Sequence, residues 1–152
     1  MRFKISAVPE SEKPKLWEEL QNYLAELSKL GGRTAVNGVF PYRYFDAYWR
    51  EPGRWPFWIK AQEAIAGFAL VRKLDDGAFE MAEFYIRPEH RRSGIGAGSA
   101  RELFARFPGR WHLSEFKENA AAIAFWRRVL QDLGAYEETV GAERVEQSFT
   151  LT

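Results

Sequence analysis

The sequence predicts a mixed α/β (α+β) domain whose sheet of about seven strands is mostly antiparallel. Alternating apolar residues separated by turn signals indicate three consecutive strands in the middle of the chain. Two helical stripes then flank a further strand, which favours a parallel crossover between that strand and the one before it. The length of 152 residues and the apolar content of 46% fit one domain over residues 1–152.

The elements of the first half follow in chain order. Alternating apolar residues at 3–7 predict an opening strand, and leucines at helical spacing over 16–30 predict a helix that ends at a Gly pair. Residues 37–56 are irregular and rich in aromatic residues and Pro, with a short helix expected at 44–49. Three strands of a meander are expected next, at 57–59, 67–71 and 79–86.

The second half alternates helices with strands. An apolar stripe over 100–107 predicts one buried face on a helix that ends at Pro108-Gly109, and a strand is expected at 111–116. Asn119 is a good cap for the next helix, which Gly134 ends. Two final strands are expected at about 135–140 and 145–151.

The segment 86–96, Ile-Arg-Pro-Glu-His-Arg-Arg-Ser-Gly-Ile-Gly, joins a strand to a helix and has the features of a phosphate-binding loop. Arg91 and Arg92 bring positive charge, and Gly94 and Gly96 let a backbone approach an anion without a Cβ in the way. The unpaired amides at the start of the helix point to the same place. An ordinary tight turn with two solvated arginines is the alternative. ATP and NAD sites are disfavoured, because neither Gly-x-x-x-x-Gly-Lys-Ser/Thr nor Gly-x-Gly-x-x-Gly occurs.

Two motifs resemble those of the GNAT superfamily of N-acetyltransferases. The order x-Pro-x-x-Arg-x-x-Gly-x-Gly after an apolar strand end resembles its acyl-CoA pyrophosphate loop. The segment 119–126, Asn-Ala-Ala-Ala-Ile-Ala-Phe-Trp, resembles the Asn-x-x-Ala-x-x-Phe-Tyr helix start that borders the pantetheine arm. The cofactor-binding residues that this resemblance implies are Phe84, Ile86, Arg91, Arg92, Gly94, Ile95, Gly96, Ala97, Asn119 and Trp126.

The resemblance also implies a fold and an activity. The fold is GNAT-like, with helices on both faces of the sheet and a splayed central parallel strand pair that holds acyl-CoA. The activity is transfer of an acetyl group from acetyl-CoA to a primary amine, directly in a ternary complex. A small-molecule amine is favoured over a protein acceptor. The implied acceptor pocket is walled by the first two helices, their connection and the last strands, a region in which surplus aromatic residues would suit an apolar amine.

Glu80 is the first candidate for the catalytic base, because many superfamily members carry a Glu or His six residues before the position of Ile86. Glu83 is the runner-up, since without a bulge it lies on the opposite face of the strand. The alternative for either carboxylate is a surface ion pair with Arg or Lys.

The expected general acid is missing. The Tyr that protonates the thiolate in the superfamily would fall at position 126, which is Trp here, and an indole cannot deliver a proton at neutral pH. Protonation is then expected from Tyr85, from water or not at all, and Trp126 also suits a core position. A non-catalytic acyl-CoA-binding or sensing module is therefore the alternative function.

Composition excludes several other classes. The absence of Cys removes disulfides, thiolate metal sites and a cysteine nucleophile, and the two His lack ligand-spaced partners, so we expect no metal. Basic and acidic residues number 22 and 21 and are interleaved, which argues against a nucleic-acid partner. No segment resembles an export signal or a membrane span, so a cytoplasmic location without membrane contact is expected. Either a monomer or a homodimer fits.

Overall fold

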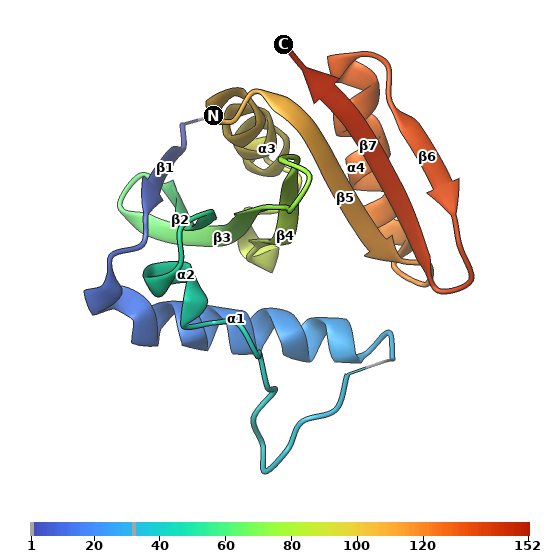
Figure 1. Ribbon diagram of the computed structural model, residues 1–152. Helices are drawn as coiled ribbons and strands as arrows, with labels where there is room; N and C mark the ends of the chain where they lie inside the picture. Colours follow the sequence, from blue (N-terminus) through green and yellow to red (C-terminus); the bar gives the residue numbers. More distant parts are fainter. Residues whose placement is uncertain (1, 32) are drawn as a thin grey trace.

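A single sheet contains every strand of the computed structural model, which describes residues 2–31 and 33–152 (Figure 1). The strand order is β1-β2-β3-β4-β5-β7-β6. All neighbouring strands are antiparallel except β4 and β5, which are parallel. The predicted mixed, mostly antiparallel sheet of seven strands is therefore confirmed.

The elements occur in the predicted order, with boundaries that differ by a few residues. The strands are β1 (Lys4–Ala7), β2 (Arg54–Ala61), β3 (Ala64–Lys73), β4 (Phe79–Ile86), β5 (Gly109–Phe116), β6 (Glu137–Val140) and β7 (Arg144–Leu151). The helices are α1 (Lys13–Ser28), α2 (Ala47–Arg50), α3 (Ile95–Arg106) and α4 (Ala120–Leu133). None of these helices is both long and apolar enough to cross a membrane.

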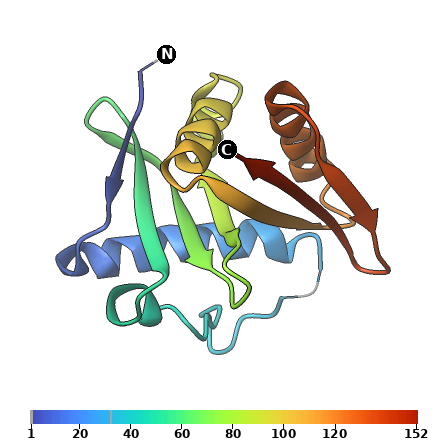
Figure 2. The ribbon, with the colours of Figure 1, turned by 45° about the horizontal axis from the view of Figure 1, so that its top comes forward.

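Helices cover both faces of the sheet, with α1 and α2 on one face and α3 and α4 on the other (Figures 1 and 2). The core under α1 and α2 is built around Leu16, Leu20 and Leu24, whose i, i+4 spacing places all three on one fully buried stripe. The core under α3 and α4 includes Phe104 and Trp126. The sheet thus separates two apolar layers, and any opening between its strands connects the two.

The two helices on the second face begin at residues suited to that position. Gly94 precedes α3 with a φ of 86°, a left-handed conformation that glycine adopts without steric cost. Asn119 caps α4, and its side chain accepts a hydrogen bond of 3.1 Å from the Ala122 amide. Both helix N-termini therefore have fixed positions at the same end of the sheet as the C-terminal ends of β4 and β5.

The central parallel strands part soon after they begin. Phe79 is opposite Trp111 and Glu80 is opposite His112, and the parallel pairing stops there. Beyond that point β4 stays paired with β3, and β5 stays paired with β7 as far as Phe116. The two strands consequently diverge and leave a gap in the middle of the sheet.

A bulge in β4 changes the side of the sheet on which its later residues lie. In the β3–β4 register Leu70 is opposite Glu83 but Val71 is opposite Met81, so Ala82 is an extra residue in β4. Met81 packs in the core under α3 and α4, whereas Ala82 packs against the core under α1. Glu83 therefore lies on the α1 side, the same side as Glu80, and not on the opposite side as a bulge-free strand would place it.

Gly67 keeps β3 in contact with the C-terminal half of β4. A Cβ added at Gly67 would lie 1.9 Å from the Tyr85 carbonyl oxygen, which is a backbone atom and cannot rotate away.

We expect Gly67→Ala to lower the free energy of unfolding by about 3 kcal/mol, as for other overpacked sites, measured by urea denaturation. The exposed Ala64→Ser change on the same strand is the control, and equal stability of the two variants would contradict the close approach.

Candidate active site

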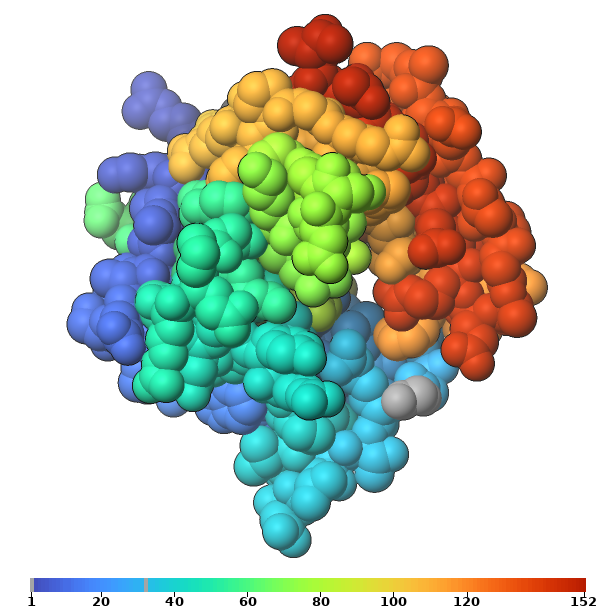
Figure 3. Space-filling model, viewed as in Figure 1, coloured from blue at the N-terminus to red at the C-terminus, as the bar shows by residue number. Residues whose placement is uncertain are grey.

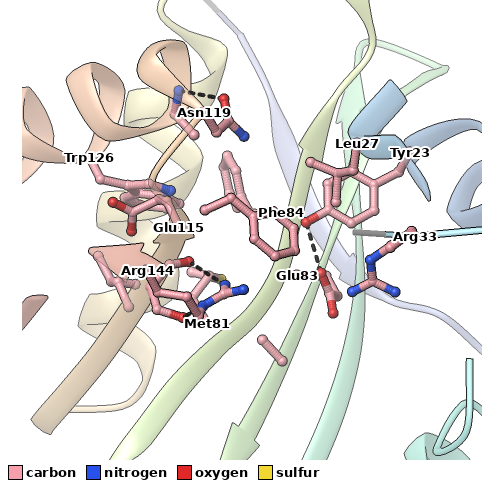
Figure 4. A pocket seen from close by; sticks show the side chains of 15 residues that line it. Tyr23, Leu27, Arg33, Met81, Glu83, Phe84, Glu115, Asn119, Trp126 and Arg144 are labelled. Carbon is pink, nitrogen blue, oxygen red and sulfur yellow. Dashed lines mark hydrogen bonds between the residues drawn. The ribbon is translucent and has the colours of Figure 1, made fainter. Parts of the chain in front are cut away.

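The gap between β4 and β5 opens into a pocket (Figure 4). Its walls come from β4, β5, the start of α4, α1 and the start of β7. In the space-filling view a notch lies between the lime segment around β4 and the orange and red C-terminal segments (Figure 3). The pocket thus lies where the strands part.

The wall on the α3 and α4 side is mostly apolar. Trp126 is 7% exposed and packs edge-on against Phe84, with ring centroids 5.1 Å apart. Met81 and the capping residue Asn119 line the same pocket. The structure brings three residues of the predicted cofactor site together here, namely Phe84, Asn119 and Trp126.

The wall on the α1 side holds a carboxylate between two phenols. Tyr23 on α1 donates a hydrogen bond to Glu83 Oε1, and Tyr42 in the α1–α2 connection donates one to Glu83 Oε2, each at 2.8 Å. Arg33 and Arg144 also line the pocket, and Figure 4 shows them on opposite sides of the opening with Phe84 and Glu83 between them. This side of the pocket is therefore polar and charged.

The electrostatics of Glu83 are a balance of opposing effects. Burial raises the pKa of Glu83 above its usual range. The hydrogen bonds from Tyr23 and Tyr42 and the positive charges of Arg33 and Arg144 favour the ionised form and partly oppose that rise. The net effect is a pKa of Glu83 above its usual range, because burial outweighs the contacts that favour the ionised form.

Glu80 and Tyr85 lie outside this pocket. Glu80 accepts a hydrogen bond of 2.7 Å from Arg72 on β3 and is half-buried in that ion pair. Tyr85 packs in the core under α1, with Arg91 over its ring at 5.7 Å. The structure therefore brings Glu83 into the pocket and places the other two predicted catalytic residues elsewhere.

The glycine loop leads into α3 as predicted, and the helix begins without a side-chain cap. Ser93 Oγ is 3.5 Å from the Ile95 amide, and no side chain of the described residues caps the amides of Gly96 and Ala97. An uncapped N-terminus of this kind favours an anion. Gly96 also meets a packing requirement, because a Cβ there would lie 3.1 Å from the Phe125 ring on α4.

The two arginines of the loop differ in their surroundings. Arg91 donates from Nε to the Ile86 carbonyl at 2.8 Å and pairs with Glu26 on α1, so its guanidinium braces the end of β4. Arg92 is exposed, with a φ of 59°. Of the pair, Arg92 is the one whose charge stays available to an anion on the loop.

Backbone groups of β4 also face the gap. The Arg87 amide donates to the Ala66 carbonyl on the β3 side. Because successive residues of a strand direct their backbone groups to opposite sides, those of Phe84 and Ile86 are directed toward β5. The Ile86 carbonyl is taken by Arg91, and the amides of Phe84 and Ile86 are directed into the gap without a strand partner among the described residues.

Comparisons with known proteins agree with this arrangement. The model of the Acetyltransferase (GNAT) family matches residues 16–130. The chain belongs to this family. A search of curated proteins finds no match to the sequence.

Solved GNAT structures share the fold at low identity. The ribosomal-protein-S18-alanine N-acetyltransferase from Escherichia coli is 16% identical, with 99% of this chain and 95% of that chain covered and a TM-score of 0.70. An acetyltransferase from Thermus thermophilus is 16% identical, with 99% and 98% covered and a TM-score of 0.75. Spermidine N-acetyltransferase from Vibrio cholerae, solved with CoA and spermine, is 12% identical, with 98% and 95% covered and a TM-score of 0.71.

This GNAT chain has a second buried carboxyl in its pocket. Glu115 on β5 is 4% exposed; its Oε1 accepts a hydrogen bond of 2.9 Å from Gln147, and its Oε2 has no partner among the described residues. Gln147 Oε1 is also buried without a described partner. A protonated carboxyl can exchange two hydrogen bonds with a side-chain amide, which would satisfy both atoms. In accord with this, burial raises the pKa of Glu115 to about 7.

Sequence reasoning missed several residues of the pocket. Tyr23 and Leu27 lie on the predicted first helix and could have been found as its residues facing the sheet. Arg33 and Arg144 lie in a loop and at a strand start, where no local pattern marks them. Glu115 follows the alternation of β5 and could have been recognised as a carboxyl at an inward-facing position. Among the described residues, no cluster of three or more His, Asp or Glu could hold a metal ion.

The raised pKa of Glu115 predicts a pH-dependent effect on stability. A carboxyl whose pKa is higher in the folded state contributes most below its ordinary value of 4.5, and that contribution is lost as the pH rises toward about 7. We expect Glu115→Gln to become more stable relative to the wild type as the pH is raised from 5 to 8. The measurement is the difference in Tm between variant and wild type at each pH, where 1 kcal/mol corresponds to about 3 °C.

The exposed Glu146→Gln change on β7 is the matched control. A Tm difference between Glu115→Gln and wild type that is the same at both pH values would show that Glu115 is ionised in the fold.

Proposed function

We propose that this GNAT protein, acting as one domain over residues 1–152, transfers the acetyl group of acetyl-CoA to the primary amine of a small molecule. The transfer is direct, in a ternary complex. The observation that carries the proposal is the gap that forms where β4 and β5 part beyond Glu80 and His112. The pocket in this gap has Phe84, Asn119 and Trp126 on one face of the sheet and Glu83 on the other, and the N-terminus of α3 follows the C-terminal end of β4.

The residues around the gap suit acetyl-CoA, whose thioester would supply the acetyl group. The amides of Gly96 and Ala97 and the charge of Arg92 offer a site for the pyrophosphate. The amides of Phe84 and Ile86 offer hydrogen bonds along the edge of β4. Such backbone donors also stabilise the negative charge that develops on a carbonyl oxygen during acyl transfer. The chain solved with CoA and spermine has the same fold, which supports the choice of cosubstrate.

Glu83 is the proposed proton acceptor for the amine. Each of its oxygens accepts one phenol hydrogen bond, and a carboxylate can accept about four, so it retains capacity for an ammonium or a bridging water. The raised pKa of Glu83 makes it a stronger base than an exposed carboxylate. Glu80 is not proposed, because Arg72 holds it outside the pocket.

The described residues on the α4 wall of the pocket include no phenol that could lie beside the leaving thiolate. Trp126 occupies that wall, and Tyr85 is packed on the other side of the sheet. We therefore assign protonation of the thiolate to water. The same observation is what favours the second candidate, an acyl-CoA-binding module without turnover. Amine-dependent release of CoA thiol separates the two.

A charge change at Gly94 tests the pyrophosphate site. We expect Gly94→Glu to weaken acetyl-CoA binding at least about 30-fold by calorimetry, because it places negative charge at the start of α3. Gly94→Gln is the matched control, with the same size and the same strain at a φ of 86° but no charge. Equal affinity of the two folded variants would place the pyrophosphate elsewhere.

Neutralising each carboxylate of β4 tests the base. We expect Glu83→Gln to lower kcat/KM by about 100-fold while the Kd for acetyl-CoA stays unchanged. In the wild type kcat/KM should rise with pH as the buried carboxyl ionises, and this rise should be missing in the variant. Glu80→Gln is the control and should retain the wild-type profile; loss of the profile in Glu80→Gln alone would restore Glu80 as the base.

A further inference from the structure

The acceptor side of the pocket contains two arginines that have no carboxylate partner among the described residues. The described arginines that are half-buried are Arg33, Arg54, Arg72, Arg87, Arg127 and Arg144. Four of these have a carboxylate oxygen within 4.0 Å, namely Arg54, Arg72, Arg87 and Arg127. The other two, Arg33 and Arg144, line the same pocket. Both half-buried arginines that have no carboxylate partner among the described residues therefore lie at this site.

The two guanidinium groups approach from separate elements. Arg33 lies in the α1–α2 connection, and its Nε is buried without a hydrogen-bond partner among the described residues. Arg144 begins β7 and donates to Ser114 Oγ at 3.0 Å and to the Ser114 carbonyl at 3.3 Å, neither of which carries a charge. Both guanidinium charges act on Glu83, which lies between them in Figure 4.

On the α1 side of the pocket one carboxylate, Glu83, faces two guanidinium groups, whereas Glu115 lies on the α4 side of the sheet, where it accepts a hydrogen bond from Gln147. A buried donor without a partner costs free energy, and a guanidinium is satisfied best by a carboxylate that accepts two parallel hydrogen bonds. Glu83 already receives hydrogen bonds from two phenols, and it is not within ion-pair distance of either arginine. One further negative charge would balance the region, and the cavity that the acceptor enters is where it would fit.

We infer that the acceptor is an amino acid or a similar compound that carries a carboxylate next to its amine. The inference rests on the proposed function and narrows it. Arg33 and Arg144 bind the carboxylate, and Glu83 faces the ammonium, so the three side chains together orient a zwitterion. A polyamine is disfavoured, because its second ammonium would meet two guanidinium groups.

Binding of matched ligands to the CoA-saturated protein tests this inference without requiring turnover. The best of the twenty amino acids is identified by calorimetry and then compared with its carboxamide and its decarboxylated amine. We expect the acid to bind about 10- to 100-fold more tightly than either, as for hydrogen bonds to a charged group. Equal or tighter binding of the decarboxylated amine overturns the inference.

Two arginine variants test whether Arg33 and Arg144 cause the preference for the acid. Arg33→Gln and Arg144→Gln, on separate elements, should each reduce the preference for the acid over the decarboxylated amine at least about 10-fold. Arg128→Gln, at an exposed position on α4, is the control and should retain the preference. A preference for the acid that persists in both pocket variants overturns the inference, even where one variant folds poorly.

The outcomes also separate this inference from the proposed function. Selective binding of the acid without release of CoA thiol from acetyl-CoA would contradict acetyl transfer and support the carboxylate site. Efficient acetylation of the decarboxylated amine would support acetyl transfer and contradict the carboxylate site.

Discussion

The early end of the β4–β5 pairing is the constraint on which the rest of the structure depends. Each central strand has a partner that holds it along its whole length, β3 for β4 and β7 for β5, so the two can diverge without losing the sheet. The divergence leaves backbone donors of β4 without a strand partner in the gap, a cost that a ligand can remove. It also makes a passage between two faces that the cores otherwise seal.

The two faces of the sheet have different chemistry because of the bulge at Ala82. With the extra residue, Glu83 turns toward α1 and reaches Tyr23 and Tyr42, while Phe84 turns toward Trp126. Without it the carboxylate would point into the aromatic layer under α3 and α4. One added residue thus places charge on the acceptor side of the gap and apolar surface on the cofactor side.

Periodicity predicted the fold well, because each helix and strand carries its own pattern and its own start or stop residue. The cofactor side also follows local patterns, since the glycine loop and the cap at Asn119 are contiguous motifs. The acceptor side of the pocket does not follow local sequence patterns. The bulge in Met81-Ala82-Glu83 has no Gly or Pro to mark it. Arg33 and Arg144 line one pocket although they are more than a hundred positions apart in the sequence. Arg91 satisfied the loop motif in the sequence, yet Glu26 and the Ile86 carbonyl hold it against β4.

Hydrogen exchange measured with and without acetyl-CoA tests the central claim that the gap between β4 and β5 is where the cosubstrate lies. The amides of Phe84 and Ile86 face the gap and those of Gly96 and Ala97 begin α3, and none of these four amides has a strand or side-chain-cap partner among the described residues. Acetyl-CoA at a concentration that saturates the protein by calorimetry should slow exchange in both segments together. Saturated binding that leaves both segments unchanged and protects another surface would contradict the account.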